Sequence, residues 1–250
     1  MNREMRRNRK MKSEAGPGRL RFLLSVVAFV AFCNPAKAYD VIPVDKGGEL
    51  TGTIKFSGDP PANPSHQVVN NADYCGSSVE EEKYLIGAGH ALRNVVVTIE
   101  GLQKGKKGED PLLVIENRKC HFVPHVQVGM VGDSYEVRNA DPVLHNTHLH
   151  LDDATLLNIA MPAGGKNIKK GITGTGIINV KCDAHKFMQG WIVVSDNPYS
   201  AVSDEEGRFK ITDIPPGKYS IKLWHEAFPS RTKEVEILPG KATSISVDFK

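Results

Sequence analysis

The stretch that decides the fold of this chain is Cys182-Asp-Ala-His185-Lys-Phe-Met188. It has the spacing C-x2-H-x2-M and continues directly into the apolar segment Gln189-Gly-Trp-Ile-Val-Val194. A second histidine, His145, lies 37 residues before the cysteine. Each of these four side chains therefore lies beside a segment that is typical of a β-strand.

One thiolate, two imidazoles and one thioether are the ligands of a mononuclear blue-copper site. Soft sulfur suits Cu(I) and nitrogen suits Cu(II), so this mixed set suits both oxidation states moderately well. We therefore take His145, Cys182, His185 and Met188 as candidate copper ligands.

The ligand motif and its flanks resemble the cupredoxins, and within them the amicyanin type, which has the same short loop. The resemblance rests on His145-Asn-Thr-His148, on Phe187-Met-Gln-Gly-Trp-Ile-Val-Val194, and on the F-x-P segment that opens at Phe122. It covers roughly residues 112 to 196 and implies a Greek-key β-sandwich.

The same resemblance implies the roles of individual residues. His145 would be the buried imidazole ligand and His185 the exposed one, through which the electron leaves. Asn146 matches the position whose side chain keeps the ligand loop rigid. The expected docking surface around His185 is apolar and comprises Pro142, Leu144, Met161, Pro162 and Phe187.

The C-terminal part resembles the carboxypeptidase regulatory-like, transthyretin-like sandwich, by Ser203-Asp-Glu-Glu-Gly207-Arg-Phe209 and by Pro215-Pro-Gly217-Lys-Tyr219. Two segments before the cupredoxin part, 48–56 and 95–101, resemble the first strands of that module. We expect an all-β protein in which the cupredoxin is inserted between halves at about 47–103 and 197–250. A serial arrangement is the alternative. The expected domains are 39–111, 112–196 and 197–250.

Residues 1–38 have a basic start, an apolar run and an Ala36-Lys37-Ala38 cleavage signal, which together predict a signal peptide. We therefore expect a periplasmic or secreted protein with no transmembrane segment in the mature chain. Without these residues the chain has 23 basic and 27 acidic residues, a balance that gives no support for nucleic-acid binding.

Three cysteines follow the predicted cleavage site: Cys75, Cys120 and Cys182. If Cys182 binds copper, Cys75 and Cys120 are left either to form a disulfide or to remain buried thiols. An oxidising compartment favours the disulfide.

From these patterns we predict that the protein is not an enzyme but a type 1 copper protein that transfers single electrons. The family likeness implies a c-type cytochrome or a periplasmic dehydrogenase as partner. Two alternatives remain, a copper carrier and a carbohydrate- or envelope-binding module in which Trp224 stacks on a sugar. The sequence assigns no chemistry to His125, His148 or His150.

Overall fold

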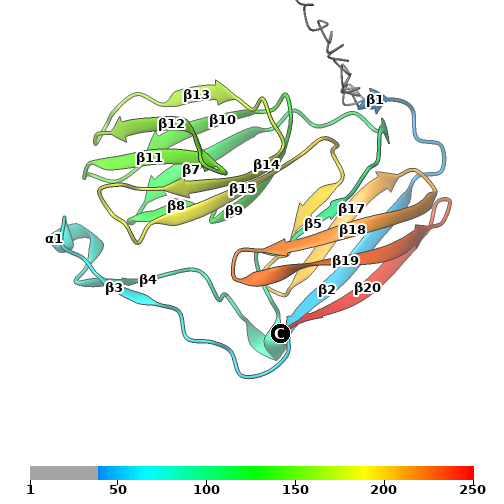
Figure 1. Ribbon diagram of the computed structural model, residues 1–250, viewed down its shortest axis with the longest axis horizontal. Coiled ribbons are helices and arrows are strands. Elements are labelled where there is room, and N and C mark those ends of the chain that lie inside the picture. Colours follow the sequence, from blue (N-terminus) through cyan, green and yellow to red (C-terminus); the bar gives the residue numbers. More distant parts are fainter. Residues whose placement is uncertain (1–38) are drawn as a thin grey trace, which may run out of the picture. The chain divides into compact units, whose positions relative to one another are not determined.

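The computed structural model describes residues 39–250 (Figure 1), so the predicted signal peptide lies outside the described residues. Within this range the regular structure is β-strand, apart from one four-residue helix, α1 (Ala72–Cys75), and a 3-10 turn, η1 (Ala88–His90). No helix in the described range is long and apolar enough to cross a bilayer.

The middle of the chain forms a first β-sandwich. Its sheets have the strand orders β13-β10-β7-β8 and β12-β11-β14-β15-β9. The strands are β7 (Leu112–Arg118), β8 (His121–Val123), β9 (Val126–Met130), β10 (Ser134–Asn139), β11 (His145–Leu151), β12 (Ala154–Met161), β13 (Ile168–Gly171), β14 (Gly176–Lys181) and β15 (Gln189–Ser195). Parallel pairing of β7 with β10 and of β9 with β15 links strands that are distant in sequence, as in a Greek key.

Alternating apolar residues hold the first sandwich together. In β7 the buried positions are Leu113, Ile115 and Asn117, and the residues between them are more exposed. One continuous core includes Phe122 and Leu149 together with Cys182 and Met188 of the ligand loop. The candidate ligands are therefore part of the packed interior.

Strands that precede the first sandwich in the sequence and strands that follow it together form a second sandwich. Its sheets have the orders β16-β5-β18-β19 and β17-β2-β20. The strands are β2 (Gly48–Phe56), β5 (Val96–Ile99), β16 (Ser200–Val202), β17 (Arg208–Ile214), β18 (Gly217–His225), β19 (Phe228–Ile237) and β20 (Ala242–Phe249). β2 pairs with β17 and β20, while β5 pairs with β16 and β18. The expected domain boundaries themselves stay a prediction.

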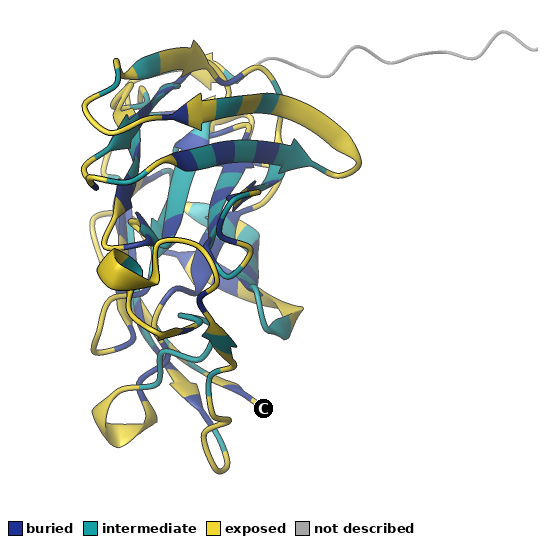
Figure 2. Ribbon diagram, turned by 90° about the vertical axis from the view of Figure 1, so that its left-hand side faces the viewer, coloured by how far each residue is buried: buried dark blue, intermediate teal, exposed yellow. Residues whose placement is uncertain are grey.

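The two turn motifs identified in the sequence of the second sandwich form turns in the structure. Gly207 has a φ of +69°, and its N–H donates to the Asp204 carbonyl at 2.9 Å to close the turn before β17. Phe209 lies in the core, and the Tyr219 hydroxyl donates to the Pro215 carbonyl at 2.8 Å. Figure 2 shows the alternation of buried and exposed residues along the long strands.

A segment between β2 and β5 carries α1 between two short paired strands, β3 (Ser65–Gln67) and β4 (Ser78–Glu80). We call residues 65–80 the cap; it is drawn in cyan in Figure 1. α1 has no fully buried residue, and its one half-buried apolar residue that packs against the core of the first sandwich is Cys75. A further short parallel pair joins β1 (Asp40–Val41) to β6 (Lys104–Gly105).

Candidate metal centre

Three of the four predicted ligands converge in the interior of the first sandwich. His145 opens β11, Cys182 directly follows β14, and His185 lies in the loop that leads to β15. One ligand atom from each of these residues lies within 4.8 Å of the other two, and all three residues are buried. The ends of two strands and one loop therefore position the three side chains.

The two imidazoles point their Nδ1 atoms at the centre of this cluster. His145 Nε2 lies 2.8 Å from Asp141 Oδ2, and His145 Nδ1 is buried without a hydrogen-bond partner. His185 Nε2 lies 3.1 Å from Asn71 Oδ1, and its Nδ1 lies 3.7 Å from Cys182 Sγ. A proton on each Nε2 leaves a lone pair on each Nδ1, which is the form of histidine that binds a metal.

Met188 belongs to the same buried cluster. Its N–H donates to the His185 carbonyl at 2.9 Å, which closes a tight turn between the two residues. The side chain is 2 % exposed and packs in the core that contains Cys182. A thiolate, two imidazole nitrogens and a buried thioether together fit copper better than a hard cation.

Burial dominates the electrostatics of the cluster. It raises the pKa of the Cys182 thiol, although backbone N–H groups, that of Asn146 among them, act in the other direction. Burial likewise lowers the pKa of His145 and of His185. A metal ion that binds here must displace the thiol proton, so we expect affinity to rise with pH.

Asp141 is the buried partner of His145. Burial raises the pKa of its carboxyl, but hydrogen bonds from two backbone amides, the Tyr74 hydroxyl and the His145 ring outweigh this and hold the pKa below its ordinary value. The amides are those of Lys119 and Cys120, at 2.6 and 2.9 Å. Asp141 therefore acts as an acceptor that orients the imidazole.

Asn146 ties the ligand loop to its neighbours, as the resemblance implies. Its backbone N–H donates to Cys182 Sγ at 3.3 Å, and its Oδ1 accepts the Asp183 N–H at 3.0 Å. Its Nδ2 donates to Asn158 Oδ1 at 2.6 Å. These bonds join β11, β12 and the loop beside Cys182.

The expectation that His185 is exposed is wrong. His185 is only 2 % exposed, because the cap passes over this edge of the cluster. Asn71 meets the ring, and Asn70 Nδ2 donates to the Ala184 carbonyl at 3.2 Å. No pattern in the cap predicted this contact, since it joins residues 114 apart in sequence.

The expected apolar surface around His185 is also partly wrong. Met161 is 1 % exposed and belongs to the core, whereas Leu144 is 53 % exposed. Beside His185 the structure instead has a cavity lined by cap residues His66, Gln67, Val69 and Asn70 and by loop residues 183–187. A molecule that approaches His185 from this side therefore meets the cap.

The predicted disulfide between Cys75 and Cys120 is confirmed, with the two Cα atoms 5.7 Å apart. It joins α1 of the cap to the turn between β7 and β8. Cys182 is the free cysteine of the described chain and is buried. The alternative of two buried thiols is thus wrong.

The remaining histidines stand apart from the ligand cluster. The ring centroids of His148 and His150 lie 3.8 Å apart, and His148 Nδ1 lies 3.1 Å from Asp183 Oδ1. His125 bonds through Nε2 to Glu226, a carboxylate that also accepts the Trp191 indole N–H at 2.9 Å. Sequence reasoning missed Glu226, because its role depends on a contact between the two sandwiches.

A second convergence of ligand-type groups in residues 39–250 comprises Cys120, Asp141 and His145. The Cys120 sulfur is already bonded to Cys75, so it offers no thiolate to a metal. This set overlaps the first at His145 and adds no separate metal site.

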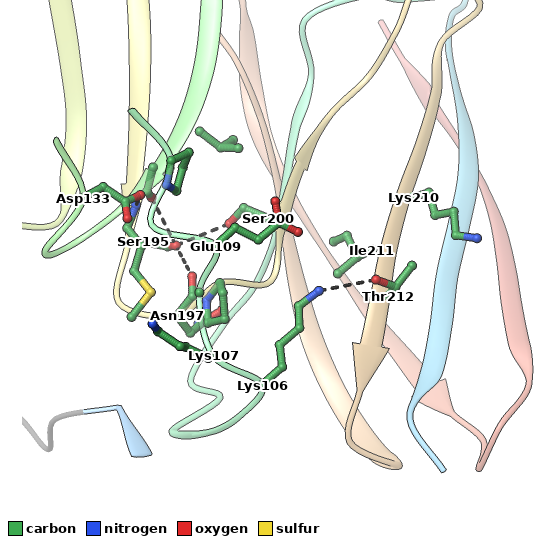
Figure 3. Close-up of a pocket in the computed structure, with 16 residues that line it drawn as sticks. Lys106, Lys107, Glu109, Asp133, Ser195, Asn197, Ser200, Lys210, Ile211 and Thr212 are labelled. Atoms are coloured by element: carbon green, nitrogen blue, oxygen red, sulfur yellow. Dashed lines mark hydrogen bonds between the residues drawn. The ribbon is translucent and has the colours of Figure 1, made fainter. Parts of the chain in front are cut away.

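A cavity of about 240 Å³, shown in Figure 3, lies away from these ligands. Its lysines have partners: Lys106 Nζ donates to Thr212 Oγ1 at 3.3 Å, and Lys107 pairs with Asp110 at 3.1 Å. Burial raises the pKa of Asp133 at its edge, although the Met130 N–H at 2.7 Å acts against this. We assign no ligand to this cavity.

The strand order and the buried cluster of one cysteine thiol and two imidazoles define a cupredoxin-like domain, which is joined to a second β-sandwich. A family model described as polysaccharide lyase family 4, domain II, matches residues 175–245. No curated protein matches the sequence.

Several solved structures are similar to the chain. A reduced proline-to-phenylalanine variant of amicyanin shares 23 % identity, with 40 % of this chain and 98 % of that chain covered and a TM-score of 0.31. A purple cupredoxin from Nitrosopumilus maritimus shares 21 % identity, with 33 % and 96 % covered and a TM-score of 0.29. A copper-containing nitrite reductase from Thermus scotoductus SA-01 shares 21 % identity, with 34 % and 22 % covered and a TM-score of 0.30.

Proposed function

We propose that this protein is a type 1 copper protein that transfers single electrons and has no catalytic activity of its own. The observation that carries the proposal is the convergence of Cys182 Sγ with imidazole nitrogens of His145 and His185 in a buried cluster. Bound copper would supply a one-electron couple. Met188, buried beside Cys182, would hold the copper as the fourth ligand.

The chain's own residues keep this site rigid. Hydrogen bonds to Asp141 and Asn71 fix the outer nitrogens of the two imidazoles, and the Asn146 N–H fixes the sulfur. A site whose ligands cannot rearrange loses little energy to reorganisation when an electron arrives. This rigidity favours electron transfer over copper delivery, which needs exchangeable metal.

Compartment and partner are parts of the same proposal. The signal-like sequence at 1–38 and the Cys75–Cys120 disulfide both favour an oxidising compartment, and we propose the periplasm. The partner would be a c-type cytochrome or a dehydrogenase there. It would dock over the cap and the loop at 183–187, because the His185 ring is covered.

A binding module is the second candidate. One observation favours it: the family whose model matches residues 175–245 is named after a polysaccharide lyase domain. Against it, the half-buried Trp224 ring packs edge-on against Trp191 with centroids 5.5 Å apart, so part of its surface is already used in a contact within the protein. Pull-down on polysaccharide without any copper colour would favour this candidate.

The experiment that tests the main proposal compares two histidine variants of the mature protein during Cu(II) titration. We expect His145→Gln to lose the intense thiolate-to-copper absorption, because it removes a nitrogen ligand. His148→Gln is the matched control, since His148 lies on the same strand but outside the cluster. Colour that survives in His145→Gln would contradict the ligand assignment.

A further inference from the structure

The outer nitrogens of both candidate imidazole ligands are held through residues of the cap. Asn71 Oδ1 lies 3.1 Å from His185 Nε2. The Tyr74 hydroxyl donates to Asp141 Oδ1 at 2.8 Å, and the other oxygen of the same carboxylate lies 2.8 Å from His145 Nε2. One short segment thus reaches one ligand directly and the other through a single carboxylate.

A single turn of chain brings these groups together. The N–H groups of Tyr74 and Cys75 donate to the Asn71 carbonyl at 3.0 and 2.9 Å, so the three residues belong to one hydrogen-bonded turn. Asn71 has a φ of +60°, a left-handed conformation that asparagine tolerates better than most residues. Cys75 then anchors the turn to the first sandwich through its bond to Cys120.

The turn that carries Cys120 also binds Asp141. The Cys120 N–H donates to Asp141 Oδ2, and the Lys119 N–H donates to Asp141 Oδ1. The carboxylate is therefore clamped between the turn that carries Cys120 and the Tyr74 hydroxyl. Since α1 has no fully buried residue, these polar contacts and the disulfide hold the turn in place.

We propose that the cap is a clamp on the metal centre, in which Asn71 positions His185 and Tyr74 positions His145 through Asp141. Partners on the outer nitrogen of a ligating histidine fix its tautomer and ring orientation, and their loss commonly costs 10–100-fold in metal affinity. The inference rests on the proposed function in one respect: both histidines are taken to be ligands.

The test measures solvent exchange of the imidazole Nε2 protons by ¹⁵N NMR, on the mature full chain loaded with diamagnetic Cu(I) and, in parallel, without metal. In the unaltered protein we expect both protons on Nε2 and protected from exchange. Asn71→Gly keeps the backbone conformation but removes the acceptor, so exchange at His185 should rise about tenfold or more while His145 stays unchanged.

The matched variants separate positioning from simple coverage. Asn71→Asp retains an acceptor and should restore protection at His185. Tyr74→Phe keeps the ring and removes the hydroxyl, so it should affect His145 alone. Asp73→Asn is the control, because Asp73 is exposed on the same turn and bonds neither imidazole nor Asp141. Equal effects of Asn71→Gly at both histidines, or none at either, would overturn the proposal.

Removing the disulfide in a Cys75→Ser, Cys120→Ser double variant should expose both protons together. If this variant fails to fold, the single variants at Asn71 and Tyr74 still decide the question with the disulfide intact. The measurement without metal also keeps the two proposals apart. If the protein binds no copper but shows the expected exchange pattern, only the proposed electron-transfer function is refuted. If it binds copper but exchange is unchanged in the variants, only the clamp is refuted.

Discussion

At the scale of single residues, the candidate ligands could be identified from the sequence, but the groups around them could not. The types and order of His145, Cys182, His185 and Met188 already point to copper. Asp141 lies four residues before His145, a separation that in a loop does not say whether the two side chains meet. The contact of Asn71 with His185 spans 114 residues and needs the fold to be known.

Met188→Leu tests the axial role. Leucine fills a similar volume, so the free energy of unfolding should change by less than about 1.5 kcal/mol. Cu(II) loses more than Cu(I) when a donor is removed, so the reduction potential should rise while the blue colour remains. Voltammetry of the variant beside the unaltered protein gives the answer. A potential that does not move would mean that Met188 is not a ligand.

His225 in β18 should make stability depend on pH. Burial lowers its pKa from 6.5 to about 4, with a smaller opposing effect of Glu226. The unfolded chain therefore binds the proton more readily than the folded one. The stability from this group is complete above pH 6.5 and is lost as the pH falls toward 4, with a total of about 3 kcal/mol.

Urea unfolding between pH 4.5 and 7 checks this, and the difference between the unaltered protein and His225→Gln isolates the one residue. The variant should show a flatter dependence of unfolding free energy on pH across this window. Parallel curves for the two proteins would mean that the ring is not buried as neutral imidazole.

At the scale of elements, the long strands follow from apolar alternation and turn residues, whereas the cap does not. The segments expected as strands at 48–56, 95–101 and 189–194 correspond to β2, β5 and β15. The cap segment at 65–80 has no apolar periodicity, and α1 has no fully buried residue. Its position depends on a disulfide and a few polar contacts, which leave no periodic signal in the sequence.

Removing the disulfide should show how much the cap depends on it. The bond closes a loop with a sequence separation of 45, so loss of the disulfide in Cys75→Ser, Cys120→Ser should destabilise the protein by about 2–4 kcal/mol. Equilibrium denaturation under non-reducing conditions measures this directly. A midpoint equal to that of the unaltered protein would show that the tether contributes nothing to stability.

At the scale of the whole molecule, two resemblances in the sequence were enough to predict two sandwiches. The pairings of β2 and β5 with strands of the C-terminal segment could only be conjectured, because strand partners depend on long-range contacts. The contacts between the two sandwiches through Glu226, His125 and Trp191 have no local signature and were not predicted.

Deleting residues 197–250 removes the strands that pair with β2 and β5 in the sheets, which are β16, β17, β18 and β20, and leaves β2 only an isolated bridge from Lys55 to Ala91. The remaining fragment would present unpaired edges and an uncovered apolar face. We expect the 39–196 fragment to aggregate, as size-exclusion chromatography would show. A soluble fragment with native strand content would mean that the two strands find another arrangement.

The central claim is that Cys182 is the thiolate ligand of a type 1 copper site, and one measurement tests it most directly. Optical and spin-resonance spectra of the copper-loaded mature protein should show intense visible thiolate-to-copper absorption and a narrow copper hyperfine splitting. Both should vanish in Cys182→Ser, because serine oxygen is hard and gives no low-energy charge transfer. A weakly coloured complex with ordinary hyperfine splitting, unchanged by Cys182→Ser, would contradict the account.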